Sequence, residues 1–157
     1  MSIVGRIEDA KGRLEAAEKL LKEFDYAGAM FEAQRCIELS VKAFLDKLDI
    51  NYRKIHDVSD KIPESFEKLK PYLEDYEVNS ARIELARAAV LLKLLVSIRT
   101  CLEYGVGNGK QVLASSKEIF DITFGKRLAN TFVELVSSSY WRIYNLISKV
   151  GNRKERN

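Results

Sequence analysis

Residues that interrupt a helix, crosslink the chain or ligate metals are scarce in this sequence. Its 157 residues include two prolines, eight glycines, two cysteines and one histidine, His56. Cys36 and Cys101 lie far apart and form no CxxC pair, and one histidine is too few to complete a zinc tetrad with them. We therefore expect no structural metal and no other cofactor, and we interpret both cysteines as small buried hydrophobic residues.

Long apolar runs and a large excess of one charge are also absent. The chain has no uncharged apolar stretch long enough to span a membrane and no apolar region behind a basic start, so we expect a cytoplasmic protein without membrane contact. Its net charge of +3 comes without the clear basic stripe that marks many nucleic-acid-binding proteins. Charge alone therefore permits RNA as a partner but does not point to it.

Helical periodicity fills most of the sequence between these few interruptions. Apolar residues recur at alternating steps of three and four along 3–24, and Asp25 is placed to cap a second such segment over 26–48. So little chain separates the two segments that we expect an antiparallel helical hairpin. In the first segment the residues predicted to face inward are Ile3, Ile7, Ala10, Leu14, Ala17, Leu21 and Phe24.

An irregular region follows the second helix. Residues 49–55 are predicted to form a loop, and the helical stretch that starts at His56 is interrupted near Pro63 and closes near Pro71. It is the least regular part of the predicted fold.

A long helix is then predicted from Asn79 or Ser80 to a stop at Gly105. Its middle is apolar on nearly every side, so we expect it to be both the central helix of the bundle and a surface covered by a second subunit. After a loop over 105–116, SSKE offers a capping box before the last helix. The last helix is predicted to bury Leu128, Phe132, Leu135, Val136, Ile143 and Leu146.

These elements predict an all-α protein. The expected architecture is an up-and-down bundle of four long helices plus a short irregular helix after the second, in one domain over residues 2–150. Residues 151–157, GNRKERN, are expected to form a basic, frayed tail.

The second helix carries the pattern of a known family. The stretch YAGAMFEAQRCIELSVKAFLDKL is followed, after a loop, by His56 and Asp57. This resembles the HEPN domain, a small nucleotide-binding helical bundle found in prokaryotes and eukaryotes. The matching residues in and after this helix are Tyr26, Ala29, Ala33, Gln34, Ile37, Glu38, Lys42, Ala43, His56 and Asp57. Arg99, Tyr104, Gly105 and Phe120 continue the match further along the chain.

The resemblance implies a sequence motif for ribonuclease activity, against which this chain can be compared. By this resemblance, a HEPN ribonuclease works without a metal and uses an arginine that is followed, after four to six residues, by a histidine. Its sites come from two subunits brought together at a dimer interface. Imidazole, with a pKa of about 6.5, can take a proton from a ribose 2′-hydroxyl, while arginine stabilises charge on phosphate. Here Arg53 lies only three residues before His56, and Tyr104 occupies the histidine position after Arg99. Because tyrosine has a pKa of about 10, the motif is not intact and the sequence favours a non-catalytic protein.

Several residues are candidates for nucleotide or partner binding. Glu38 and Lys42 are four positions apart with the acid first, which favours a helical ion pair. His56 is interpreted first as a residue packed at the start of a helix, second as a binding residue beside Arg53 and Asp57, and third as catalytic. The binding candidates are Arg35, Glu38, Lys42, Arg53, His56, Asp57, Arg99 and Tyr104, and the catalytic candidates are His56, Arg53 and Arg99.

Three hypotheses for the function remain open. The leading one is a non-catalytic, homodimeric HEPN-like protein that binds a nucleotide, RNA or a partner protein. The resemblance implies a minimal nucleotidyltransferase as that partner, in a prokaryotic toxin–antitoxin arrangement. It also implies that AMP is attached to a tyrosine such as Tyr104. From the sequence alone, Tyr104 is instead interpreted as an aromatic contact at the helix end. The alternatives are a metal-independent ribonuclease toxin with a diverged active site and a purely structural interaction module.

Overall fold

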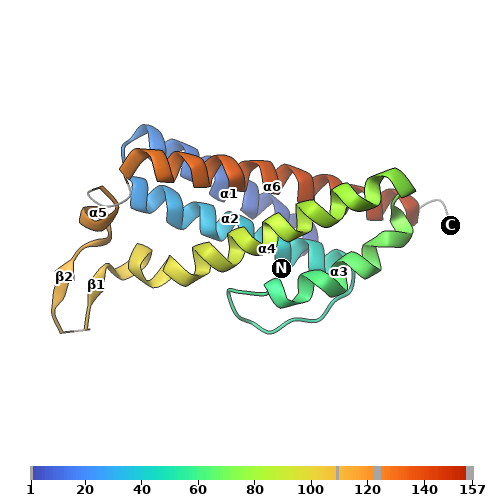
Figure 1. Cartoon of the computed structure of the whole chain (residues 1–157), viewed down its shortest axis with the longest axis horizontal. Coiled ribbons are helices and arrows are strands. Elements are labelled where there is room, and N and C mark those ends of the chain that lie inside the picture. The colour runs from blue at the N-terminus through green and yellow to red at the C-terminus, as the bar shows by residue number, and fades with distance from the viewer. Residues whose placement is uncertain (1, 109, 122–124, 155–157) are drawn as a thin grey trace.

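Four long helices form the body of the protein. The computed structural model describes residues 2–108, 110–121 and 125–154. The long helices are α1 (Ile3–Lys22), α2 (Tyr26–Lys47), α4 (Asp75–Tyr104) and α6 (Gly125–Lys154). Figure 1 shows that successive long helices run in opposite directions along the molecule. The predicted all-α bundle is confirmed, and no helix in the described ranges is long and apolar enough to cross a membrane.

Helix α2 occupies the centre of the bundle and contacts α1, α4 and α6. Its alanines Ala29, Ala33 and Ala43 are fully buried, and such small side chains let neighbouring helices approach closely. The prediction that the long apolar helix, α4, is central was wrong, because its Val90 and Leu94 remain exposed.

Cys36 on α2 is buried as expected, and burial raises the pKa of its thiol to about 12. Cys101 on α4 is half-buried.

Side-chain caps set the first helix ends. Ser2 accepts a hydrogen bond from the first turn of α1, and Asp25 accepts one from the backbone N–H of Gly28 at 2.9 Å, which confirms the predicted cap of α2. Helix α1 ends at Lys22, and Phe24 takes a positive φ of 62°. This conformation turns the ring of Phe24 outward, so its predicted inward position was wrong.

The region after α2 is irregular, as predicted. Two 3₁₀ turns, η1 (Ser59–Lys61) and η2 (Lys70–Tyr72), flank the short helix α3 (Ile62–Leu69). Proline lies in the first turn of both α3 and η2, where its missing N–H costs least.

Helix α4 begins at Asp75, earlier than the predicted Asn79 or Ser80. A capping box forms between Glu74 and Glu77, which places a glutamate at a position where Ser, Thr, Asn or Asp is usual.

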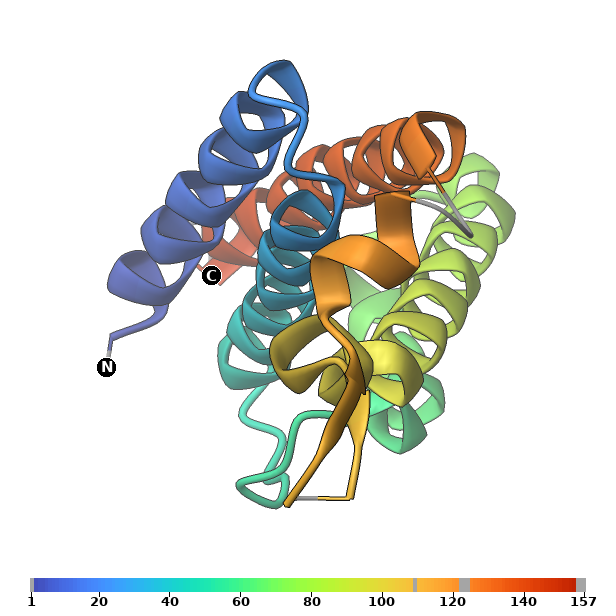
Figure 2. The same ribbon diagram turned by 90° about the vertical axis from the view of Figure 1, so that its left-hand side faces the viewer.

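The predicted loop after α4 contains a small β-hairpin. Strands β1 (Val106–Gly107) and β2 (Val112–Ala114) pair antiparallel, and Figure 2 shows the hairpin projecting from the bundle. Leu113 is 85% exposed there. These strands are too short for their alternation to be recognised in the sequence.

The described part of the last segment contains a short helix and a long one. The predicted capping box forms between Ser115 and Glu118, but it starts a separate short helix, α5 (Ser116–Ile119). Helix α6 then continues through residues 151–154, the first part of the predicted tail; residues 155–157 lie outside the described ranges. Of the six residues predicted inward, Val136, Ile143 and Leu146 are buried, Leu128 and Phe132 are half-buried, and Leu135 is exposed, contrary to prediction.

Candidate functional site around Glu38

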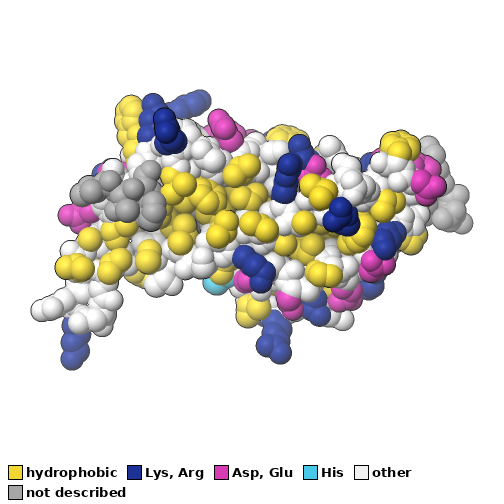
Figure 3. All heavy atoms as spheres, viewed as in Figure 1, with side chains coloured by type: hydrophobic (Ala, Val, Ile, Leu, Met, Phe, Trp, Pro, Cys, Tyr) yellow, Lys and Arg dark blue, Asp and Glu magenta, His cyan; other side chains and the backbone are white. Residues whose placement is uncertain are grey.

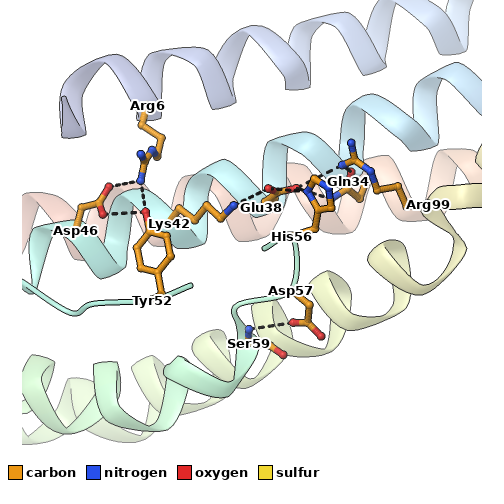
Figure 4. Close-up of polar contacts among 10 residues, drawn as sticks. All are labelled: Arg6, Gln34, Glu38, Lys42, Asp46, Tyr52, His56, Asp57, Ser59 and Arg99. Atoms are coloured by element: carbon orange, nitrogen blue, oxygen red, sulfur yellow. Dashed lines mark hydrogen bonds and ion pairs between the residues drawn. The ribbon is translucent and has the colours of Figure 1, made fainter. Parts of the chain in front are cut away.

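A buried carboxylate on α2 is the centre of a polar cluster. Glu38 is only 8% exposed. Lys42 donates a hydrogen bond to its Oε1 at 2.7 Å, and Gln34 donates one to its Oε2 at 2.8 Å (Figure 4). The predicted ion pair between Glu38 and Lys42 is therefore confirmed. Because Gln34 and Glu38 are buried, this polar face of α2 packs inside the protein rather than lying free on its surface.

Arg99 reaches the cluster from α4. Its Nη1 donates to Oε1 of Gln34 at 2.9 Å and lies 3.6 Å from Oε2 of Glu38. Its Nε lies 3.8 Å from a carboxylate oxygen of Glu103, one turn further along α4. The guanidinium carbon is also 5.4 Å from the centroid of the Phe31 ring, a cation–π contact. Four groups thus hold Arg99 in place, and its side chain is mostly buried.

His56 approaches the same carboxylate from the loop after α2. Its Nδ1 lies 3.2 Å from each carboxylate oxygen of Glu38, while its side chain remains about half exposed. Since a carboxylate only accepts hydrogen bonds, Nδ1 carries the proton in this contact. The predicted position at a helix start was wrong, because the next element begins only at Ser59 and His56 lies in the bend before it.

The hydrogen bonds keep Glu38 ionised. Burial alone raises the pKa of its carboxyl group. The hydrogen bonds from Lys42, Gln34 and His56, together with the charge of Lys42, outweigh burial and lower the pKa below its ordinary value. At neutral pH the site therefore contains a fixed negative charge that orients the cationic groups around it.

Two predicted site residues in the loop lie outside the cluster. Arg53 is exposed and lines a neighbouring depression together with Asp60 and Lys61. Asp57 accepts a hydrogen bond from the backbone N–H of Ser59 at 3.0 Å, and in Figure 4 its carboxylate points toward Ser59 and away from Glu38. Asp57 therefore orders the loop, and Arg53, a binding and catalytic candidate, lines a different depression from His56.

Arg35 and Tyr104 lie at the edge of the cluster. The guanidinium carbon of Arg35 is 6.0 Å from the ring centroid of Phe31, so Arg35 approaches the same ring as Arg99. Tyr104 is 69% exposed, so the predicted aromatic contact at the helix end was wrong. A hydrogen bond to Glu103 raises the pKa of its hydroxyl group above the ordinary value. The Tyr104 side chain is therefore accessible from solvent.

Sequence reasoning missed the role of Gln34 and a second network beside it. Gln34 bridges Arg99 and Glu38, and its polar side chain one turn before Glu38 on the same helix was the available signal. In the second network Arg6 contacts both Asp46 and Tyr52, and the Tyr52 hydroxyl donates to Asp46 at 2.9 Å. No local pattern links Arg6 to partners so far along the chain.

A depression of about 460 Å³ joins the two networks at the surface. Its charged or titratable lining residues are Arg6, Glu38, Lys42, Asp46, Tyr52, Lys54 and His56. Within residues 2–108, 110–121 and 125–154, no group of three or more His, Cys, Asp or Glu side chains is placed to hold a metal ion. The depression instead presents N–H donors, which suit an anion.

Comparison with known proteins gives one family. The model of the HEPN domain family matches residues 4–91, more than half of the chain. The chain belongs to the HEPN domain family. The matched part of this HEPN domain includes Glu38 and His56 and ends before Arg99, so it covers the α2 and loop sides of the cluster but not the α4 side. No curated protein and no solved structure matches the chain.

Proposed function

We propose that this HEPN domain binds a phosphate-bearing ligand, a nucleotide or an RNA phosphodiester, as a homodimer and without cleaving it. The observation that carries the proposal is the meeting of Arg99 and His56, far apart in sequence, on the single carboxylate of Glu38 beside an open depression. Exposed apolar side chains on α4 support the homodimer.

The charges around the depression favour an anion. Three cationic side chains, Arg6, Lys42 and Lys54, line it against two acids, Glu38 and Asp46, and the polar ring of His56 lies beside them. Figure 3 shows the histidine, in cyan, at the surface of the molecule, where solvent reaches it. Ion pairs hold Lys42 and Arg6 in position before any ligand arrives, which lowers the entropy cost of ordering them on binding.

Substitution of exposed groups at the depression tests the ligand site. We expect His56→Ala and Lys54→Ala each to weaken binding of an adenine nucleotide or a short single-stranded RNA about tenfold, because each removes a charge-assisted or polar contact worth roughly 1.5 kcal/mol. Isothermal titration calorimetry at fixed salt measures the effect. Lys19→Ala, an exposed lysine on α1, is the matched control and should bind as the wild type does.

The outcome that contradicts the ligand site is equal affinity of the wild type and both variants. If neither nucleotide nor RNA shifts the thermal midpoint of the wild type, the protein is an interaction module without this ligand, since a ligand that binds only the folded state must stabilise it.

The contact between Glu38 and His56 favours a second candidate, a metal-independent ribonuclease. A carboxylate that holds Nδ1 of an imidazole fixes its tautomer and leaves Nε2 as the base, and Arg99 lies on the same carboxylate. This candidate predicts cleavage of RNA in excess EDTA that is lost in His56→Ala. Cleavage at the wild-type rate by that variant excludes His56 as the base, and no cleavage by the wild type supports the binding proposal.

A further inference from the structure

The segment that follows α2 is buried at both ends and exposed between them. Ile50 and Val58 belong to the hydrophobic core, with exposed fractions of 4% and 1%. Most residues between them lie at the surface, and Ile55 is 47% exposed although it is apolar. In Figure 1 the chain bows out from the bundle here, between α2 and α3. We call residues 51–56 the strap.

Backbone hydrogen bonds do not tie the strap to the bundle. The bond from the N–H of Ile55 to the carbonyl oxygen of Arg53, at 2.8 Å, stays within the strap. None of the backbone–backbone bonds described for residues 2–108, 110–121 and 125–154 joins the strap to a helix. A segment with anchored ends and no such bonds in its middle can open locally while the rest of the domain stays folded.

Two side chains attach the strap to α2. The Tyr52 hydroxyl donates to Asp46 at 2.9 Å and also contacts Arg6 of α1. At the other end of the strap, Nδ1 of His56 lies 3.2 Å from Glu38. Figure 4 shows both rings reaching from the loop toward α2. Because Glu38 and Asp46 are two turns apart, about 12 Å along the helix, each end of the strap has its own attachment point.

The strap forms one wall of the depression of about 460 Å³ beside Glu38. Every strap residue except Arg53 lines this depression, together with side chains from α1 and α2. Lys54 and His56 belong to the strap, whereas Lys42 belongs to α2. An outward movement of the strap would therefore carry two of the groups proposed to bind the ligand away from the third.

We propose that the strap is a hinged wall of the depression, which the contacts of Tyr52 and His56 hold closed in the free protein. Tyr52 is thus a positioning residue, since it sets where Lys54 lies without needing to touch the ligand. A phosphate group that contacts Lys42 on α2 and Lys54 on the strap links the two walls and favours the closed arrangement further. This last step rests on the proposed function, whereas closure of the free strap does not.

Trypsin tests the hinged strap, because it cleaves after arginine and lysine and both Arg53 and Lys54 are exposed there. A protease needs an extended segment, so cleavage at these two positions reports how often the strap opens. We expect Tyr52→Phe to be cleaved there about fivefold faster than the wild type, because it loses the hydroxyl and keeps the ring. His56→Ala should have an effect of similar size, and the two factors should multiply in the double variant.

Tyr144→Phe is the matched control and should be cleaved as the wild type is, because Tyr144 lies on α6, outside the strap and the depression. Cleavage after Lys19, within α1, reports opening of the helices themselves. Equal cleavage of the strap in the wild type and both strap variants overturns the proposal. An equal acceleration after Lys19 and in the strap also overturns it, because the two contacts then stabilise the whole domain rather than the strap.

Ligand protection separates this inference from the proposed function. We expect saturating ATP or a short single-stranded RNA to slow cleavage of the strap in the wild type, because the bound phosphate links its two walls. If neither slows it while Tyr52→Phe and His56→Ala accelerate cleavage as expected, the ligand site is wrong and the hinged strap is correct. If a ligand protects the strap but neither variant opens it, the ligand site is correct and the hinged strap is wrong.

Discussion

Replacing Glu38 by alanine is expected to lower the free energy of unfolding at pH 7 by about 3 kcal/mol. The variant leaves the charges of Lys42 and Arg99 without their shared buried partner, and losing one member of a buried pair costs about 3–5 kcal/mol. We expect the lower end because both cationic side chains keep some contact with water. Urea denaturation measures the change, which corresponds to a fall in Tm of roughly 6–12 °C for a domain of this size.

Glu103→Ala is the matched control for this prediction. It removes another carboxylate beside Arg99, but one that is one-third exposed and 3.8 Å away, so the expected loss is below about 1 kcal/mol. Equal losses in Glu38→Ala and Glu103→Ala would contradict the central role of Glu38.

The stabilisation by Glu38 also depends on pH. Because the folded-state pKa of Glu38 lies below its ordinary value, its stabilisation is complete above the unfolded pKa of about 4.3 and is lost as the pH falls through the folded pKa. The isosteric variant Glu38→Gln should therefore be less stable than the wild type at pH 7, and the difference should shrink as the pH is lowered below about 4. A difference that does not change with pH would contradict this assignment.

Gly105→Ala is expected to destabilise the protein by roughly 3 kcal/mol. Gly105 has φ 73° and ψ −154°, a conformation that is essentially restricted to glycine and costs other residues about 1–3 kcal/mol. An added Cβ would also overlap the backbone of Ala114 and Ser115, which places the effect at the upper end. Local opening of the hairpin limits the loss, so faster hydrogen exchange over 106–114 should accompany it.

Gly12→Ala is expected to have the opposite effect on stability. Gly12 lies within α1, and a Cβ there meets nothing within 4 Å. We expect this variant to stabilise the protein by about 0.5–1 kcal/mol, because alanine loses less conformational freedom than glycine on helix formation. If Gly105→Ala is as stable as Gly12→Ala, the described hairpin geometry is wrong.

The sequence predicts the helices well because helical periodicity is a local signal. The start of α4 was predicted too late because Glu74 is an uncommon capping residue. Phe24 was predicted to face inward because the sequence does not reveal the left-handed backbone conformation at that position. Leu135 satisfies the helical period but is exposed and lines a groove between α4 and α6 rather than the core. An extended apolar stripe does not by itself tell which part is covered by the chain's own helices.

Some contacts of the candidate site were predicted from the sequence and others were not. The pair of Glu38 and Lys42 is one turn apart and was predicted from spacing alone. The contacts of His56 with Glu38 and of Arg99 with Gln34 join residues 18 and 65 positions apart, respectively, and no periodic pattern encodes such distances. The single histidine drew attention to the right loop, but only the fold shows which carboxylate it faces.

The hydrogen bonds that Gln34 forms with Arg99 and Glu38 affect the register between helices α2 and α4. The buried side chains of α4 are alanines and leucines, and α2 also buries several alanines. Surfaces of this kind tolerate sliding by one helical turn, about 5.4 Å. A slide of that size would carry Arg99 away from both Gln34 and Glu38 and leave its mostly buried guanidinium without these two partners. Because an unpaired buried charge is costly, the amide and its neighbours set the register between two helices that apolar packing alone would leave loosely defined.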